Sequence, residues 1–246
     1  MKTTQNTILI TGGGSGIGFE MAKAFSALGN LVIITGRDQN RLESAASIIP
    51  GVATIQCDVT KQADVENLVK KLHNEFPSLN IVINNAGQVY VYDLAGDKKI
   101  FSQASEEILT NYLSTIRLNE ELISILKGQK ESAIVNVSSI VAFVPSQRMA
   151  TYSASKAALH SYSQALRLSL SNTAVKVFEL MPPLVNTAFS KEIGGERGIA
   201  PFLVAEELIK AFEKDIYEIH VGQTANIFEL YRKSPGEALR MMNPTL

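Results

Sequence analysis

Short apolar stretches alternate with longer amphipathic stretches along almost the whole chain. The apolar stretches are rich in β-branched residues and alternate little with polar ones, which is typical of strands buried on both faces of a sheet. They predict strands at Thr7–Thr11, Leu31–Thr35, Val52–Cys57, Asn80–Asn84, Ser132–Ser138, Ala174–Leu180 and Glu218–Val221. The amphipathic stretches between them predict helices at Gly16–Leu28, Gln39–Ile48, Gln62–Glu75, Glu106–Lys127, Tyr152–Ser171 and Val204–Tyr217.

This alternation favours a doubly wound α/β fold, a parallel sheet of about seven strands with helices on both faces. No linker or repeat interrupts it, so we expect one Rossmann-type domain over residues 1–246. Two segments without a clear period, 88–105 and 187–201, each follow a predicted strand. Ligands bind beyond the carboxyl ends of such strands, and both segments are long for ordinary connections. We therefore interpret 187–201 as a mobile substrate loop, with a plain surface connection as the alternative.

The composition supports a globular protein and limits its partners. Hydrophobic residues make up 46% of the chain and charged residues 19%, which provides a core and excludes a disordered chain. The formal net charge of −1 provides no basic field for nucleic acid or anionic lipid. No stretch is apolar for long enough to span a membrane, and the first residues do not form a signal peptide. We expect a cytoplasmic protein without nucleic-acid or membrane partners.

The cysteine and histidine content argues against a disulfide and against a metal site. Cys57 is the single cysteine, so an internal disulfide cannot form. The three histidines lie far apart in the sequence, without nearby cysteines or carboxylates at the spacing of metal ligands. We therefore expect no bound metal.

A glycine-rich segment follows the first predicted strand and opens the first predicted helix. Gly12, Gly16 and Gly18 form a Gly-x-x-x-Gly-x-Gly pattern, with Ser15 and Ile17 between them. Glycines let the backbone approach a pyrophosphate closely, and the free N–H groups of a helix N-terminus bind its charge. The segment therefore predicts a dinucleotide-binding loop in which the Ser15 hydroxyl also contacts phosphate.

The end of the second predicted strand indicates which dinucleotide binds. An NAD site needs a carboxylate here for the adenosine ribose, and Gly36 stands at that position. Arg37 follows it, and an arginine binds a 2′-phosphate through charge-assisted hydrogen bonds. We therefore predict NADP as the cofactor. The alternative is NAD with Asp38 on the ribose, although Asp38 also suits a helix cap.

Tyr152 and Lys156 share one face at the start of a predicted helix, because they are four residues apart. A nearby cation favours the phenolate, so Lys156 is expected to lower the pKa of Tyr152 and make it a proton carrier. The pair alone is a weak signal, since tyrosine and lysine are frequent in the chain.

Taken together, these motifs resemble the short-chain dehydrogenase/reductase family. The resemblance extends over essentially the whole chain and rests on four motifs in order: Thr11-Gly12-x-x-x-Gly16-x-Gly18, Asn84-Asn85-Ala86-Gly87, Ser138-Ser139 and Tyr152-x-x-x-Lys156. It implies an oxidoreductase that transfers hydride between a nicotinamide and a carbonyl or hydroxyl carbon of a small molecule. It also implies a homodimer or homotetramer that pairs through the two long helices.

The resemblance implies four catalytic residues. Tyr152 would donate or accept the proton of the substrate oxygen, and Lys156 would lower its pKa and bind the nicotinamide ribose. Ser139 would polarise the substrate oxygen, whereas the adjacent Ser138 would only form a hydrogen bond at the strand end. Asn111 would hold the water of a proton relay; alternatively, it is a structural residue in a bent helix.

The family pattern also assigns further contacts with the cofactor. The adenine and its ribose would meet Asp58, Val59, Asn85, Ala86 and Gly87, and the nicotinamide would meet Pro182, Val185 and Thr187. Asp58 equally suits a cap of the following helix.

Two positions depart from the family pattern. Pro183 and Ala142 stand where the family usually has glycine. Pro183 lacks an N–H, so the contacts that a glycine would make there must differ.

Two questions stay open at this level. Phe143 and Phe189 contact either the substrate or the core. The function alternatives are an NAD-dependent alcohol dehydrogenase and a nucleotide-binding regulator without turnover, although the intact catalytic residues argue against the regulator.

Overall fold

The central sheet forms because each strand carries apolar side chains to both of its faces. In the computed structural model, which describes residues 1–244, Ile8 and Ile10 point into one core and Leu9 into the other. All three are fully buried, as are the central residues of the neighbouring strands. The sheet is parallel, and its strands are β1 (Thr7–Thr11), β2 (Leu31–Gly36), β3 (Ala53–Gln56), β4 (Leu79–Asn84), β5 (Ser132–Val137), β6 (Val175–Met181) and β7 (Glu218–His220).

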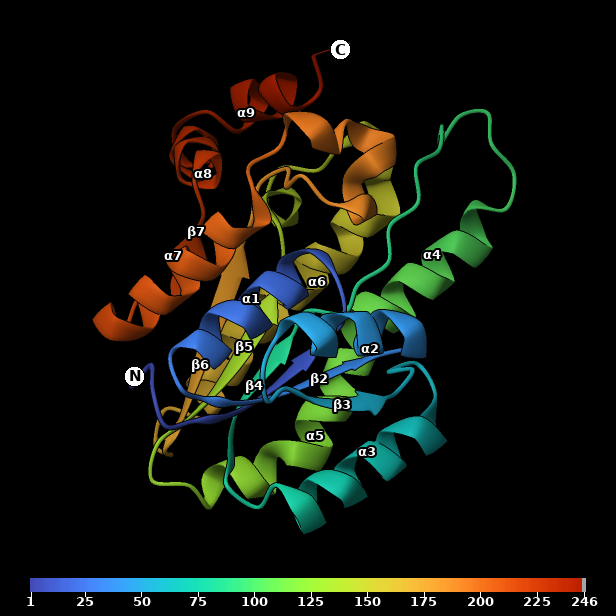
Figure 1. Ribbon diagram of the computed structural model, residues 1–246. Coiled ribbons are helices and arrows are strands. Elements are labelled where there is room, and N and C mark those ends of the chain that lie inside the picture. Colours follow the sequence, from blue (N-terminus) through green and yellow to red (C-terminus); the bar gives the residue numbers. More distant parts are fainter. Residues whose placement is uncertain (245–246) are drawn as a thin grey trace.

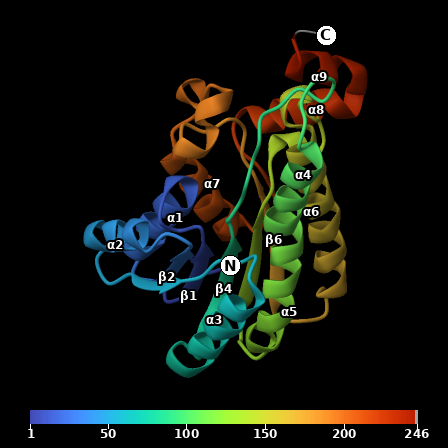
Figure 2. The same cartoon turned by 90° about the vertical axis from the view of Figure 1, so that its right-hand side faces the viewer.

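Helices cover both faces of this sheet (Figures 1 and 2). Helices α1 (Gly16–Ala27), α2 (Gln39–Ile48) and α7 (Pro201–Lys214) bury their apolar sides in one core. The other core is covered by α3 (Gln62–Glu75), α5 (Ser114–Lys127) and α6 (Ala150–Ser169). This arrangement confirms the doubly wound parallel sheet that the sequence predicts.

The strand order places a ligand site at the carboxyl edge of the sheet. The order is β3-β2-β1-β4-β5-β6-β7. Strands β2 and β3 are therefore added on one side of β1, and β4 to β7 are added on its other side. Connections leave β1 and β4 toward opposite faces, which opens a crevice beyond their carboxyl ends. The glycine-rich segment follows β1, and the Asn85-Ala86-Gly87 motif follows β4, so the topology brings both to this crevice.

The predicted strands agree with the observed ones to within one residue at each end. The helix predicted at 106–127 was placed too late, because α4 (Ile100–Ile108) precedes it and a π-helical turn (Leu109–Leu113) joins α4 to α5. Helix α4 exposes Phe101 and buries Glu107, so these two residues depart from the usual placement of apolar and charged side chains. The sequence analysis therefore missed the first part of this helix.

Helices α8 (Gln223–Lys233) and α9 (Pro235–Met242) were not predicted either. Their inward sides bury few apolar residues, among them Ile227 and Ala238. Pro235 at the first position of α9 was the available signal, since proline favours that position. Both helices lie at the upper end of the molecule in Figure 1, the end at which the strands of the sheet terminate.

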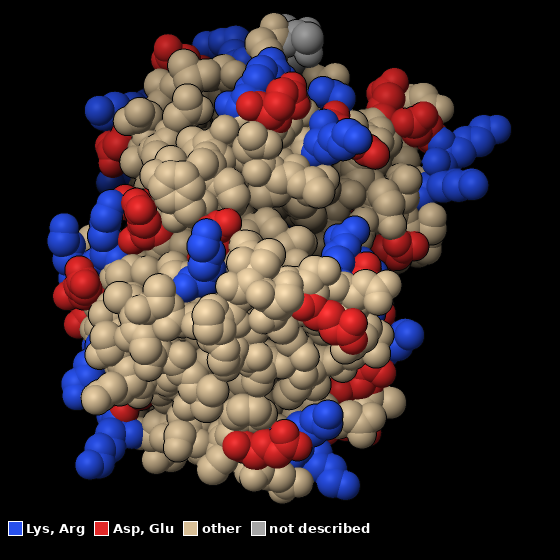
Figure 3. All heavy atoms as spheres, in the orientation of Figure 1, with Lys and Arg blue, Asp and Glu red and all other residues tan. Residues whose placement is uncertain are grey.

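The surface carries charges of both signs. Lysine, arginine, aspartate and glutamate side chains are interspersed over the face shown in Figure 3. Within residues 1–244, the helices are all too short or too polar to cross a membrane.

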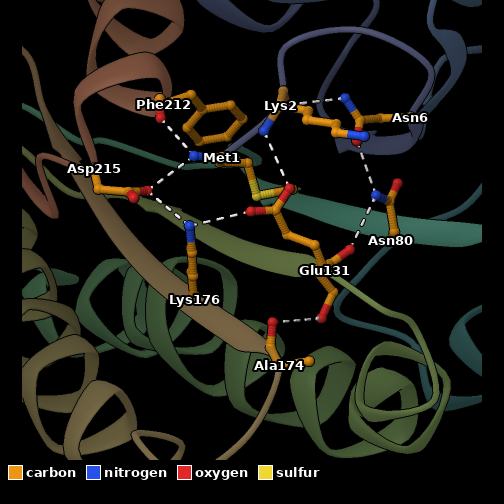
Figure 4. Close-up of polar contacts among 10 residues, drawn as sticks. Met1, Lys2, Asn6, Asn80, Glu131, Ala174, Lys176, Phe212 and Asp215 are labelled. Atoms are coloured by element: carbon orange, nitrogen blue, oxygen red, sulfur yellow. Dashed lines mark hydrogen bonds and ion pairs between the residues drawn. The ribbon is translucent and has the colours of Figure 1, made fainter.

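A polar cluster joins the amino-terminal ends of the central strands, opposite the crevice (Figure 4). Lys176 on β6 contacts Glu131 Oε1 at 3.1 Å and Asp215 Oδ1 at 2.9 Å. The Asn80 amide donates to the Glu131 carbonyl (3.2 Å) and to Asn6 Oδ1 (2.8 Å). Burial lowers the pKa of Lys176, but the two carboxylates outweigh it and raise that pKa above its ordinary value. The cluster therefore ties β1, β4, β5 and β6 together through ion pairs and amide hydrogen bonds.

We predict that Lys176→Met lowers the free energy of unfolding at pH 7 by about 1 kcal/mol. Hydrogen bonds from Lys176 and other donors lower the pKa values of Asp215 and Glu131, so their contribution exists above the unfolded values and is lost in acid. Urea unfolding at pH 7 and at acid pH should show the difference between variant and wild type shrinking below about pH 4. Lys210→Met, which breaks an exposed pair with Glu207, is the control and should have little effect. Equal losses in the two variants would contradict the prediction.

Candidate active site

A cleft of about 930 Å³ lies beyond the carboxyl ends of the strands. It brings together residues from the glycine-rich segment, from the ends of β2 to β6 and from the segment after β6. Sixteen of the eighteen predicted site residues line it: Gly12, Ser15, Gly16, Ile17, Arg37, Asp58, Val59, Asn85, Ala86, Gly87, Ser139, Tyr152, Lys156, Pro182, Val185 and Thr187. Gly18 and Asn111 lie behind its wall.

The glycine-rich segment has a backbone that only glycine adopts easily. Gly12 and Gly16 have φ of +66° and +57°, in the left-handed region. Gly18 lies below the segment, where a Cβ atom would come within 2.4 Å of the Gly12 carbonyl oxygen. Ser15 occupies the N-cap position of α1 without a capping bond from its side chain. Its hydroxyl and the first N–H groups of α1 therefore face the cleft, as an anion site requires.

Hydrogen bonds from β4 hold this segment in place. The backbone N–H groups of Asn85 and Ala86 donate to Thr11 Oγ1 at 2.9 and 3.0 Å. The Asn85 amide donates to the carbonyl oxygens of Thr11 (2.9 Å) and Gly12 (3.2 Å). The Asn85 side chain thus holds the glycine-rich segment in position. This role is additional to the packing against the ribose that the family pattern implies.

The end of β2 presents Arg37 to the cleft, and Asp38, which also lines the cleft, is bound by the start of α2. Asp38 is the N-cap of α2, and its Oδ1 accepts from the Arg41 N–H at 3.2 Å. Its Oδ2 contacts Arg41 Nε, also at 3.2 Å. Asp38 is therefore a helix cap, as the sequence suggested. Arg41 lines the same end of the cleft and was missed, because it lies one turn into a helix rather than in a motif.

Asp58 closes a turn in front of α3. Its Oδ1 accepts from the N–H of Thr60 (3.0 Å) and from its hydroxyl (2.7 Å). The N-cap of α3 is Lys61, so the helix-cap alternative for Asp58 is wrong. The residue still lines the cleft beside Val59.

Ser139, Tyr152 and Lys156 meet at the other end of the cleft. Tyr152 and Lys156 lie in the first two turns of α6, and the ammonium is 5.6 Å from the centre of the phenol ring. Lys156 Nζ donates to the Val137 carbonyl oxygen at 2.8 Å. Ser139, the N-cap of a short 3₁₀ helix, accepts from the Val141 N–H at 3.3 Å and lines the cleft together with Tyr152. The arrangement points a serine and a tyrosine hydroxyl at one place.

Burial controls the proton affinities of this pair. It raises the pKa of Tyr152 above its usual range, although the hydrogen bond with Ser139 opposes the shift and Glu107 adds to it. Burial lowers the pKa of Lys156 to about 8, against the opposing charge of Glu179. The expected lowering of the Tyr152 pKa by Lys156 is therefore absent from this pair, because the ammonium binds the Val137 carbonyl and both side chains are removed from water.

Asn111 lies in the π-helical turn and binds neighbouring elements through its side chain. Its Oδ1 accepts from the Gln88 N–H at 2.8 Å. Its Nδ2 donates to the Gln88 carbonyl oxygen (2.9 Å) and to Ser155 Oγ (2.8 Å). These bonds match the structural alternative. They tie the turn to the segment after β4 and to α6 next to Lys156.

Ser138 and Glu107 form hydrogen bonds next to the predicted catalytic residues Ser139 and Tyr152. Ser138 forms the hydrogen bond at the strand end that the sequence suggested, to Glu179. Glu107, a residue that sequence reasoning missed, is fully buried and accepts from the Tyr90 N–H (2.7 Å) and from the Thr151 hydroxyl. It therefore holds the residue before Tyr152. A buried glutamate has no signature in a single sequence.

The segment 187–201 forms two 3₁₀ turns, Ala188–Ile193 and Gly195–Arg197, beside the catalytic residues. Phe189 packs on Tyr152 with 6.1 Å between ring centres and lines the cleft. Phe143 lies elsewhere, against Phe228 at 5.1 Å, so it belongs to an aromatic cluster with α8. A parallel bridge between Val185 and Ile199 fixes the base of the segment.

The end of the C-terminal helix α9 completes the wall of the cleft. Met242 and Asn243, at the end of α9, line the cleft. Asn243 accepts from the Gln147 N–H at 2.7 Å and donates to the Pro145 carbonyl oxygen at 3.0 Å. These wall residues were missed, because the helices that carry them were missed.

Comparison with known proteins agrees with this geometry. Residues 6–198 match the family model described as short chain dehydrogenase. The chain is 40% identical over 214 residues to the Uncharacterized oxidoreductase DltE of Bacillus subtilis, covering 86% of this chain and 84% of that protein. This relative confirms a further resemblance of the sequence, to the oxidoreductase associated with the D-alanyl-lipoteichoic-acid genes.

Solved structures share the fold. A short-chain dehydrogenase from Burkholderia cenocepacia in complex with NADP has a TM-score of 0.87 and 24% identity, with 98% of each chain covered. A short-chain dehydrogenase/reductase from Burkholderia phymatum in complex with NAD has a TM-score of 0.89 and 20% identity, covering 100% of this chain and 98% of that one.

Proposed function

Since the chain belongs to the short-chain dehydrogenase family, we propose that it is an NADPH-dependent reductase of a small carbonyl compound. One observation carries this proposal: a single cleft joins an anion-binding backbone and Arg37 at one end to Ser139, Tyr152 and Lys156 at the other. A nucleotide-binding regulator without turnover would need only the end of the cleft that holds the anion-binding backbone and Arg37.

The residues present fit a nicotinamide dinucleotide. A side chain at Gly12 or Gly18 would fill the space where the backbone must come close, and Ser15 leaves the N-terminus of α1 open. In our proposal the pyrophosphate lies there, Arg37 and Arg41 face the adenosine 2′-phosphate, and Val59 and Ala86 flank the adenosine. Pro182, Val185 and Thr187 contact the nicotinamide, which supplies the hydride when bound.

In this proposal Tyr152 supplies the proton. Its raised pKa keeps the phenol protonated at neutral pH, so it can donate to a carbonyl oxygen. The Ser139 hydroxyl, which lines the same cleft, polarises the same oxygen. Lys156 places a positive charge beside the phenol ring and stabilises the phenolate left after donation. The protonated phenol is the form that reduction of a carbonyl requires.

The NAD-dependent alternative has less support. Asp38 is the carboxylate that would bind the ribose, and both of its oxygens contact Arg41. Arg37 and Asp38 both line the cleft, but the Asp38 carboxylate is held at the start of α2. Arginines at this end favour a phosphate over a bare ribose.

We also propose that the protein is a cytoplasmic homo-oligomer that pairs through α5 and α6, the outer layer on one side in Figure 2. Leu113 and Leu168 on this layer are 44% and 76% exposed, which an interface would cover. Light scattering should give a multiple of the 26.8 kDa chain mass, and Leu168→Glu should shift it toward the monomer. A monomeric wild type would contradict the proposal.

Tyr152→Phe tests the proposed reaction, because it removes the hydroxyl and keeps the ring that packs on Phe189. We predict that kcat/KM for NADPH-dependent reduction, followed by cofactor absorbance on a panel of aldehydes and ketones, falls by about a hundred- to ten-thousand-fold. NADPH affinity should change little.

Tyr162→Phe is the matched control on the same helix. Its hydroxyl accepts from Asn119 Nδ2 at 3.3 Å and lies outside the cleft, so activity should be largely retained. Turnover at the wild-type rate in Tyr152→Phe would contradict the proton-donor assignment.

A further inference from the structure

A buried acid–histidine pair lies directly behind the catalytic residues. Glu179, in the middle of β6, is fully buried, and its Oε2 lies 2.8 Å from His160 Nδ1. Its Oε1 accepts from the Ser138 hydroxyl. Ser138 directly precedes Ser139, and His160 follows Lys156 by one turn of α6. Both partners of the carboxylate are therefore attached to segments that carry catalytic groups.

Lys156 needs a negative charge nearby. Its side chain is 4% exposed, and its hydrogen-bond acceptor, the Val137 carbonyl, is uncharged. A buried ammonium without a counter-charge loses its proton readily. Glu179 is the carboxylate placed to supply that charge. Lys156 binds the Val137 carbonyl, and Val137 pairs in the sheet with Leu180, the residue after Glu179. The field of Glu179 accordingly opposes the loss of the proton.

We propose that Glu179 is a positioning residue whose negative charge keeps Lys156 an ammonium, and that Ser138 and His160 hold the carboxylate in place for this task. The inference deepens the proposed function, because the charge of Lys156 matters only if Tyr152 transfers a proton. Glu179 itself lines no part of the cleft within the described residues and touches no reacting atom.

His160 makes this support depend on pH. The hydrogen bond with Glu179 raises the pKa of His160, with burial opposing it; Glu218 of β7 adds to the rise and Arg167 of α6 reduces it. His220 of β7 also faces the pair, and burial lowers its pKa. In acid, protonated His160 neutralises the charge of Glu179, but at such pH values Lys156 keeps its proton without that charge. As the pH rises, His160 loses its proton and the full charge of Glu179 acts on Lys156.

The test is a direct titration of Lys156 by NMR, using lysine labelled with ¹³C at Cε and a Lys156→Arg spectrum for assignment. In Glu179→Gln, which keeps the size and a hydrogen-bonding oxygen, the pKa of Lys156 should fall by about one unit. Ser138→Ala is the matched control: it removes one of the two hydrogen bonds to the carboxylate but leaves its charge and its contact with His160, so the pKa of Lys156 should fall much less than in Glu179→Gln. An unchanged Lys156 in Glu179→Gln would overturn the proposal.

A second measurement needs no variant. The wild-type protein, titrated by histidine NMR, should show His160 with a pKa above the ordinary value of about 6.5. A value below that would mean that no ionised Glu179 faces it, and would overturn the proposal even if Glu179→Gln does not fold.

Activity separates this proposal from the function on which it rests. In Glu179→Gln the loss of kcat/KM at alkaline pH should begin about one pH unit lower than in the wild type. Suppose that the Lys156 pKa falls in Glu179→Gln but the wild-type protein reduces no carbonyl compound. That result would contradict only the proposed function. Carbonyl reduction with an unshifted Lys156 in Glu179→Gln would contradict only the role of Glu179.

Discussion

The close approach of α1 to the backbone that precedes it is the constraint on which the cleft depends. A side chain at Gly18 would place Cβ 2.4 Å from the Gly12 carbonyl oxygen and 2.5 Å from the Asn85 amide. Glycine at this position lets Asn85 reach across from β4 and bind the segment from below. The free N–H groups of α1 then point at one fixed place, which is what binding of a pyrophosphate requires.

Removal from water is the second constraint, and it acts on the catalytic end of the cleft. The Tyr152 phenol and the Lys156 ammonium are both buried, so one holds its proton more tightly and the other more loosely than in water. Buried carboxylates stand behind both: Glu107 binds the residue before Tyr152, and Glu179 opposes the loss of the Lys156 proton. The proton transfer that we propose therefore depends on residues outside the family motifs.

The sequence predicts the parts of the site that local chemistry determines. Gly12 and Gly16 need a left-handed backbone, and Tyr152 and Lys156 share a helix face through their spacing alone. Long-range packing decides the rest. No pattern in the sequence marks Glu107 and Glu179 as buried in the fold, and none shows that Phe101 on α4 is exposed. The expected lowering of the Tyr152 pKa by Lys156 is not found, because spacing says nothing about the burial that raises this pKa.

Calorimetric titration of the purified protein with NADPH and with NADH tests the central claim, that this cleft holds a phosphorylated dinucleotide. The chain has no tryptophan, so heat is a better signal than intrinsic fluorescence. With Arg37 facing the 2′-phosphate, NADPH should bind at least about tenfold more tightly, the effect of one charge-assisted contact. Equal or tighter binding of NADH would contradict the role of Arg37, and binding of neither would contradict the account of the cleft itself.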